Sequence, residues 1–290
     1  MRKKNKDSVS GSRQVYSTKE KVVRGMISAI LCCYCMITVV VILITVMDSF
    51  KTKIDIVTNL TGLPTKLTLD NYISFIKTGN FSLYFRNSLI LTVIGTAGCI
   101  FLSMMVAYGI ARYKFKGREL LASYTLIGSM VPIQVMILPI LLILRNVGLT
   151  DSLVGVLLIY FSMISMSCLV FQKFFMTIPA ALEESARLDG CSDFRVFVQI
   201  ILPISKPVLF TETLIMAIQF WNDFYIPMLF LNGQKTTTLT LAIYRYLTQF
   251  TTYMGESMAA VVITLLPIVI LYFLFSSQIV EGLTGGAVKG

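Results

Sequence analysis

Six long stretches with few or no charged residues are the feature that most constrains how this 290-residue chain can fold. A helix needs about 20 mainly apolar residues to cross a hydrocarbon layer about 30 Å thick, and each stretch is about that long. Several such stretches in succession are typical of a multi-span membrane protein. We expect six membrane-spanning helices, within residues 25–47, 88–111, 120–144, 153–172, 208–231 and 258–280.

The composition excludes the other broad classes. Apolar residues make up 56% of the chain and charged residues 14%, whereas soluble domains average about 45–50% and about 25%. Disorder is excluded by the same low charge and high apolar content. The first stretch is longer than the apolar region of a signal peptide. The sequence predicts an all-α membrane protein, with an N-terminal segment 1–24, a six-span domain 25–281 and a tail 282–290.

The basic residues predict the orientation. Of the 25 Lys and Arg residues, 17 lie in the N-terminal segment, in the connections after the second and fourth spans, and in the tail. Since basic residues are enriched in cytoplasmic loops, both termini are expected in the cytoplasm. The same bias accounts for the net charge of +10 without a nucleic-acid partner.

Several chemistries lack the residues that they need. The chain has no histidine, which excludes His-based acid–base catalysis and the commonest metal ligand. Its six cysteines form no pair of CxxC motifs, so we expect them to pack as small apolar residues. A phosphate-binding Gly-x-x-x-x-Gly-Lys-Ser/Thr loop is also absent from the sequence, so this chain should not hydrolyse ATP. We expect no catalytic residue, no metal and no cofactor bound by the chain itself.

The connection at residues 173–203 is predicted to carry a short helix, Ala180 to Asp189. Pro179 suits a first helical turn, Thr177 a position near the cap, and Gly190 a position just beyond the helix end. One face of this helix has small side chains. Such a shallow face suits docking into a groove on another protein.

This connection resembles the cytoplasmic signature of bacterial ABC importer permeases. The signature reads Glu-Ala-Ala, three residues, Gly, nine residues, Ile, one residue, Leu-Pro, and the chain departs from it only at Ser185. Other segments resemble the second permease subunit of maltose-type carbohydrate importers, although that family more often has Glu where this chain has Asp223. The matching residues are Glu184, Ser185, Ala186, Gly190, Ile200, Leu202 and Pro203 in the signature, and Asn71–Tyr72, Arg86–Leu89, Val131–Pro132, Trp221–Asp223 and Gly282–Gly290 elsewhere.

The resemblance implies a type I ABC importer permease in the cytoplasmic membrane of a bacterium or archaeon. It would move a carbohydrate by alternating access. The implied partners are a second, non-identical permease subunit, two copies of a cytoplasmic ATPase that binds ATP and Mg²⁺, and an extracytoplasmic solute-binding protein. The expected ATPase contacts are Glu183, Glu184, Ser185, Ala186, Asp189, Gly190, Ile200, Leu202 and Pro203, with Gly285, Gly286 and Lys289 of the tail.

Polar and aromatic residues within the spans are candidates for the solute pathway. Polar residues also pack helix against helix, and Trp and Tyr mark membrane interfaces. A structural role therefore stays open for each of these residues. Pro132 and Pro139 are expected to kink the third span. The pathway candidates are Gln134, Gln219, Asn222 and Asp223, with Trp221 and Tyr225 as flat faces for a sugar ring.

Glu212 is an acid inside a predicted span, which is costly and a functional hypothesis by default. We expect it to reach the cytoplasmic interface. Lys206 lies nearby in sequence and either pairs with it or extends to the interface by itself. An alternative is an ion-coupled secondary transporter or channel that uses Glu212 as a proton site. Such transporters usually contain inverted repeats, and none is evident. An intramembrane enzyme lacks the acid pair or metal cluster that it would need.

Overall fold

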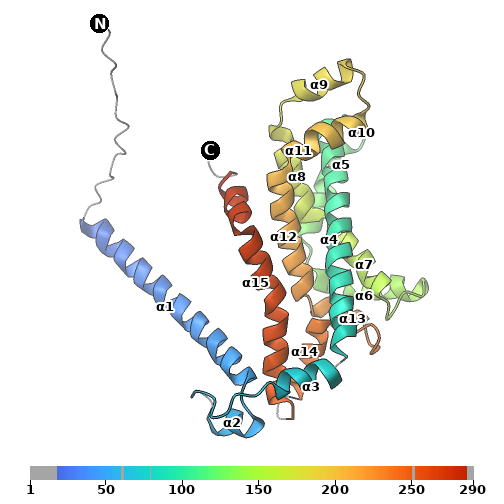
Figure 1. The fold of residues 1–290 in the computed structure, drawn as a ribbon. Coiled ribbons are helices and arrows are strands. Elements are labelled where there is room, and N and C mark those ends of the chain that lie inside the picture. Colours follow the sequence, from blue (N-terminus) through green and yellow to red (C-terminus); the bar gives the residue numbers. More distant parts are fainter. Residues whose placement is uncertain (1–17, 60–61, 79, 250–251, 286–290) are drawn as a thin grey trace.

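The computed structural model of the chain describes residues 18–59, 62–78, 80–249 and 252–285, and every regular element in them is helical (Figure 1). The helices are α1 (Thr18–Ser49), α2 (Lys53–Thr58), α3 (Asp70–Thr78), α4 (Phe81–Arg112), α5 (Arg118–Met130), α6 (Ile133–Asn146), α7 (Leu153–Ser162), α8 (Ser165–Thr177), α9 (Ala180–Leu188), α10 (Asp193–Val196), a π-helical turn η1 (Phe197–Ile201), α11 (Leu202–Ile204), α12 (Lys206–Asn222), α13 (Tyr225–Phe230), α14 (Leu239–Thr248) and α15 (Met254–Gly285).

Four continuous segments of the described residues are long and apolar enough to cross a membrane, and two sharply bent helix pairs bring the number to six if each pair is one span. The prediction of six spans is consistent with this count, and a bend was expected in the third span but not in the fifth. The continuous segments are Val22–Ser49, Phe81–Arg112, Leu153–Thr177 and Met254–Phe275.

The third predicted span is broken. Helices α5 and α6 meet at 107°, and the break falls at Val131 and Pro132, where Pro132 is the N-cap of α6. Proline lacks an N–H and disfavours a helical conformation in the residue before it, which explains the break. The kink predicted at Pro132 is confirmed, whereas α6 continues through Pro139 without interruption.

The fifth span differs from its prediction at both ends. Its main helix, α12, meets the segment Asp193–Ile204 at 80°. It also ends at Asn222 instead of continuing to residue 231. The Oδ1 atom of Asp223 accepts the backbone N–H groups of Tyr225 at 2.9 Å and Ile226 at 3.3 Å. Asp223 therefore caps the separate helix α13, which explains the second break.

Helix α4 is the centre of the core and packs against α7, α8 and α12. Gly95 lets α4 approach α7 so closely that an added Cβ would lie 2.8 Å from the Tyr160 ring. That ring is fully buried and stacks on Phe220 of α12 at a centroid distance of 4.1 Å. The small residue thus makes room for the aromatic stack between two spans.

Side chains of α4 also donate hydrogen bonds to backbone carbonyls at the break between α7 and α8. The Cys99 thiol donates to the Met163 carbonyl at 3.4 Å, and the Ser103 hydroxyl donates at 3.3 Å to the Ile164 carbonyl, which also accepts the Cys168 N–H. A membrane core offers no water to freed backbone groups, so such partners are needed. Cys99 and Cys168 are buried in this core, whereas Cys32, Cys33 and Cys35 are exposed on α1 and Cys191 is partly exposed, so the packing role expected of all six cysteines is only partly correct.

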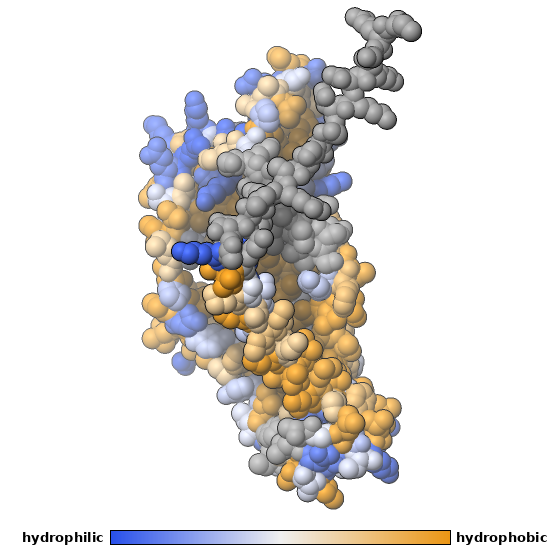
Figure 2. Space-filling model, turned by 90° about the vertical axis from the view of Figure 1, so that its left-hand side faces the viewer, coloured by the Kyte–Doolittle hydropathy of each residue, from blue (hydrophilic) through white to orange (hydrophobic). Residues whose placement is uncertain are grey.

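Helix α1 is the least covered of the spans. Its apolar segment contributes no buried residue over its most apolar 18-residue window. It lies away from the bundle in Figure 1, with its C-terminal end near α2 and α3. Much of the face drawn in Figure 2 is also apolar, as expected for a surface that meets lipid or a neighbouring subunit.

Amide and hydroxyl side chains fasten the loops at the end of the molecule that carries α2, α3 and α14. The Asn87 amide donates to the carbonyls of Lys235 and Thr237, both at 2.9 Å, and the Ser88 hydroxyl accepts the Leu239 N–H at 2.8 Å. The Asn71 amide similarly donates to two carbonyls of the segment after α1. Two segments of the family resemblance, 71–72 and 86–89, therefore hold this end together.

Two glycines provide a matched test of the packing. A Cβ at Gly155 would lie 2.4 Å from the backbone oxygen of Leu149, whereas a Cβ at Gly109 would meet nothing within 4 Å. Because a backbone oxygen cannot rotate away, Gly155→Ala should lower the free energy of unfolding by about 1–3 kcal/mol. Gly109→Ala should leave it unchanged or raise it by up to about 1 kcal/mol. Thermal unfolding of the purified variants measures both, and equal stability would contradict the packing.

Candidate coupling site

The site is built on α9, which follows α8 after a two-residue turn. Pro179 is the N-cap of α9 and lies just outside the helix, and its side chain makes no capping hydrogen bond. The prediction that Thr177 lies near the cap is wrong. Thr177 is the last residue of α8, and its hydroxyl donates to the Phe174 carbonyl at 2.7 Å.

The C-terminal end of α9 closes around Gly190 as predicted. Gly190 has a φ of 83°, a left-handed conformation that side chains other than glycine adopt with strain. Its N–H donates to the Arg187 carbonyl, and the Cys191 N–H donates to the Ala186 carbonyl, each at 3.0 Å. This pair of bonds is a Schellman motif. It turns the chain sharply out of α9 toward α10.

One carboxylate ties α9 to the helical bundle. The Glu183 side chain is 3% exposed and forms an ion pair with Nε of Arg112, the last residue of α4, at 2.5 Å. The Tyr108 hydroxyl donates to Glu183 Oε2 at 3.1 Å, and Arg187 lies 3.5 Å away on α9 itself. Arg112 also donates to the Ile178 carbonyl at 2.8 Å. We call Glu183, Tyr108, Arg112 and Arg187 the Glu183 cluster.

A second, more exposed pair extends this cluster to α10. Arg187 Nε donates to Asp193 Oδ1 at 2.8 Å, and this hydrogen bond raises the pKa of the guanidinium further above its ordinary range. Burial, followed by the negative charge of Asp193, raises the pKa of Tyr113. Arg187 therefore stays charged at physiological pH, and ion pairs join α10 to α9 and α9 to the end of α4.

The sequence prediction treated the two adjacent glutamates alike, but the structure separates them. Glu183 is buried, whereas Glu184 and Ser185 are exposed on α9. Ala186 is turned inward and buried, so the small docking face predicted from the sequence is only partly correct. Apolar side chains instead stand out from α9 and α10, with Leu188 89% exposed and Phe194 72% exposed.

The end of the signature forms part of the bent fifth span. Ile200 and Leu202 are partly buried and Pro203 is exposed, while Ile201 between them is fully buried in the core. Residues 197–201 form a π-helical turn, a distortion that is frequent at functional sites. Ile201, Tyr108 and Arg112 were not among the site residues predicted from the sequence. Only the position of Arg112 at the edge of an uncharged block hinted at its role.

The predicted tail is partly helical. Residues 282–285 continue α15, which ends at Gly285, and the cytoplasmic location of the tail stays a prediction. Gly286 and Lys289 lie outside the described residues.

The pathway candidates are not brought together as one site within this chain. Trp221 is buried, and its indole N–H donates to the Thr264 carbonyl at 3.1 Å, so its ring face is used in packing. Asp223 is half-buried and accepts the Tyr160 hydroxyl at 2.8 Å. Tyr160 was missed by the sequence analysis. Tyr225 is partly buried, and Gln134, Gln219 and Asn222 are exposed.

Glu212 is buried between helices and does not pair with Lys206. It is 7% exposed, and its Oε2 accepts the Ser167 hydroxyl of α8 at 2.8 Å, whereas Lys206 is exposed at the start of α12. The pairing with Lys206 considered from the sequence is therefore wrong, and the depth of Glu212 in the membrane stays a prediction. Glu212 joins α12 to α8 inside the bundle, where an acid is tolerated only with a polar partner.

Comparison with known proteins agrees with this architecture. Residues 99–284 match the family model of the binding-protein-dependent transport system inner membrane component. The arabinooligosaccharides transport system permease protein AraQ of Bacillus subtilis is 33% identical over 230 residues, which cover 78% of this chain and 81% of AraQ. The multiple sugar-binding transport system permease protein MsmG of Streptococcus mutans is 32% identical over 253 residues, or 86% and 91% of the two chains.

A solved structure shares the fold. A chain of a bacterial ABC transporter involved in the import of the acidic polysaccharide alginate superposes with a TM-score of 0.79, at 21% identity, over 90% of this chain and 98% of that chain. The matched residues include Glu212 and the fifth span. Because the matching family consists of binding-protein-dependent transport components, the match does not support an ion-coupled transporter. The chain belongs to the family of binding-protein-dependent transport system inner membrane components, the non-catalytic, multi-pass permease subunits of ABC importers in the cytoplasmic membrane.

Proposed function

We propose that this permease imports a carbohydrate and is driven through α9 by a separate ATPase. The proposed coupling to the ATPase rests on the difference between the two sides of α9. Its inner side is fixed to α4 by the Glu183 cluster, and its outer side presents Leu188 and Glu184 to a partner. A helix that is held on one side and uncovered on the other suits transmission of force between subunits.

The mechanism follows from these contacts. ATP and Mg²⁺ would be held by the ATPase, since this chain has no phosphate-binding loop. Closure of two ATPase copies would displace both α9 and its counterpart on a second, non-identical permease subunit. Ion pairs of the Glu183 cluster would pass the displacement to α4. Because α4 packs against α7, α8 and α12, these helices would move together, as rigid-body alternating access requires.

The substrate class rests on the relatives, AraQ and MsmG, which are named for arabinooligosaccharides and multiple sugars. Exposed amides at Gln219 and Asn222 lie in the last two turns of α12. They are suited to donate to and accept from sugar hydroxyls. The second permease subunit would supply the facing half of the pathway, and a solute-binding protein would deliver the sugar from outside.

Reconstitution tests this function directly. The permease is assembled with its genomic neighbours (second permease, ATPase and binding protein) in liposomes that are loaded with ATP. Uptake of a labelled oligosaccharide should require hydrolysable ATP and cease when the ATPase lacks its phosphate-binding lysine. Uptake that follows an imposed ion gradient without the ATPase would contradict the proposal.

The proposed orientation puts α9 and both termini in the cytoplasm. Cys191 is partly exposed beside Gly190, whereas Cys99 and Cys168 are buried. A membrane-impermeant maleimide should therefore label Cys191 in inverted membrane vesicles and leave it unlabelled in intact spheroplasts. A Cys191→Ser variant identifies the labelled residue. Labelling from outside intact cells would reverse the topology.

A further inference from the structure

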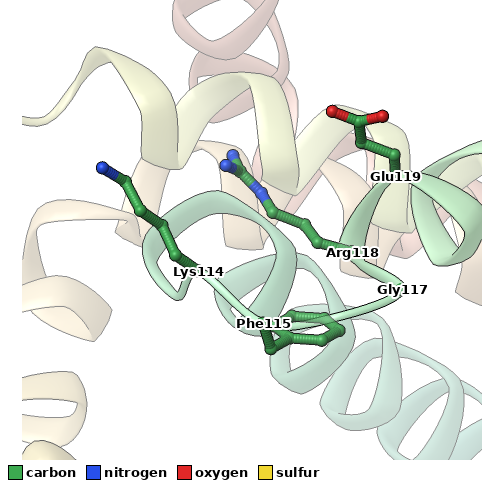
Figure 3. A pocket seen from close by; sticks show the side chains of 5 residues that line it. All are labelled: Lys114, Phe115, Gly117, Arg118 and Glu119. Carbon is green, nitrogen blue, oxygen red and sulfur yellow. The ribbon is translucent and has the colours of Figure 1, made fainter.

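A cavity of about 390 Å³ opens in the short loop that joins α4 to α5, and it is independent of the Glu183 cluster. Figure 3 shows its lining side chains, with Lys114 and Arg118 extending to the same side of the loop and the Phe115 ring lying apart from them. The five lining residues are Lys114, Phe115, Gly117, Arg118 and Glu119.

The positive charge around this cavity is not neutralised within the described part of the chain. Arg112, at the start of the loop, is paired with Glu183. In contrast, no carboxylate there lies within ion-pair distance of Lys114, Lys116 or Arg118. Arg118 is held in place because its Nε donates to the Ile110 carbonyl at 2.7 Å. Its terminal nitrogens remain available for an anion.

The backbone adds to the positive electrostatic potential around the cavity. Gly117, with a φ of 92°, leads directly into α5, and no side chain caps this helix of 13 residues. The N-terminus of a helix carries a partial positive charge and unpaired N–H groups. A negative group in the cavity would therefore face a helix end as well as two basic side chains.

The length of α4 is consistent with a loop at the depth of lipid headgroups. Residues 88–111 of α4 are uncharged and span roughly 36 Å at about 1.5 Å per residue. That length lies between the hydrocarbon thickness of about 30 Å and the full bilayer thickness of about 40–45 Å. Below the loop, α5 leaves an apolar face uncovered, with Leu120 76%, Tyr124 72% and Ile127 59% exposed. A charged cavity thus adjoins an apolar face that acyl chains can cover.

We propose that this cavity binds the phosphate group of an anionic phospholipid, whose acyl chains lie against α5. Two basic side chains and a helix end match the phosphodiester, and the neighbouring face matches an acyl chain better than a soluble anion. The proposal goes beyond sugar import and does not depend on which solute is carried.

The experiment titrates the purified transporter assembly with phosphatidylglycerol and counts bound lipids by native mass spectrometry. Lys114→Gln and Arg118→Gln should each lower the apparent affinity about fivefold, the effect expected for one basic residue at a charged membrane surface. Lys116→Gln removes the same charge from the same loop outside the cavity lining, and it should have little effect. Glu119→Gln removes the only acid in the lining and should raise the affinity. Phosphatidylcholine should bind weakly to all variants.

The outcomes separate the possible ligands. Because Arg118 also bonds to Ile110, Lys114→Gln is the decisive variant if Arg118→Gln is unstable. Equal losses in Lys114→Gln and Lys116→Gln would overturn a defined site, since only the loop's net charge would then matter. Displacement of the lipid by inorganic phosphate would overturn the lipid as the source of the phosphate group. Loss of the ATPase from the assembly with unchanged lipid binding would show a protein docking surface instead.

Discussion

Replacing Glu183 with alanine is expected to destabilise the permease by about 3 kcal/mol and to abolish ATP-driven uptake. Loss of this side chain leaves Arg112 buried without its carboxylate partner, and breaking a buried ion pair from one side typically costs about 3–5 kcal/mol. The lower value applies because Arg112 keeps its hydrogen bond to Ile178. Thermal unfolding of the purified assembly measures the stability, and liposome uptake measures the coupling.

The neighbouring glutamate is the matched control. Glu184→Ala removes the same charge and the same atoms from an exposed position on α9, so the free energy of unfolding should change by less than about 0.5 kcal/mol. If Glu184 pairs with a basic residue of the ATPase, this variant should instead weaken co-purification of that subunit. Equal destabilisation by the two substitutions would contradict the buried ion pair.

Valine at position 190 is expected to uncouple ATP hydrolysis from transport. Gly190 has a left-handed φ with nothing within 4 Å of an added Cβ, so the penalty comes from backbone strain and not from a steric clash. A β-branched residue there should reshape the turn from α9 to α10 and displace the Arg187–Asp193 pair. Uptake should fall at least tenfold while ATPase activity of the assembly persists, measured together in liposomes.

Two further variants distinguish the effect of backbone strain itself from the effect of strain at position 190. Asparagine tolerates a left-handed conformation, so Gly190→Asn should retain most of the uptake. Gly148 also has a positive φ and open space around it, in the turn after α6. Gly148→Val should therefore lose similar stability without uncoupling. If both valine variants were uncoupled, general destabilisation would explain the loss of uptake, and the turn at Gly190 would have no special role.

Local patterns predicted the parts of the fold that depend on neighbouring residues. Uncharged stretches identified the spans, Pro132 a break and Gly190 a helix end, because each effect acts within a few positions along the chain. The 80° bend at the start of the fifth span was missed, and the size of the 107° bend at Pro132 could not be predicted, since both depend on what packs against each half of the span. Asp223 as the cap of α13 was missed because a polar residue in an apolar stretch also suits a solute pathway.

Long-range partners explain the errors at the candidate site. From the sequence, Glu183 had only Arg187 as a neighbour, whereas its closest partner is Arg112 on α4. Lys206 was proposed for Glu212 because it is near in sequence, but Ser167 on another span is the partner. In both cases the buried acid is satisfied across a helix–helix interface, and spacing along one helix carries no information about that contact.

Because α4 is unbroken, movements at its two ends should occur together. This helix holds α9 through Arg112 at one end and the segment 235–239 through Asn87 and Ser88 at the other, about 40 Å away along its axis. A rod fastened at both ends needs no chain of intermediate signals. A displacement of α9 should therefore move the segment 235–239 at the same time, because both are fastened to the same helix.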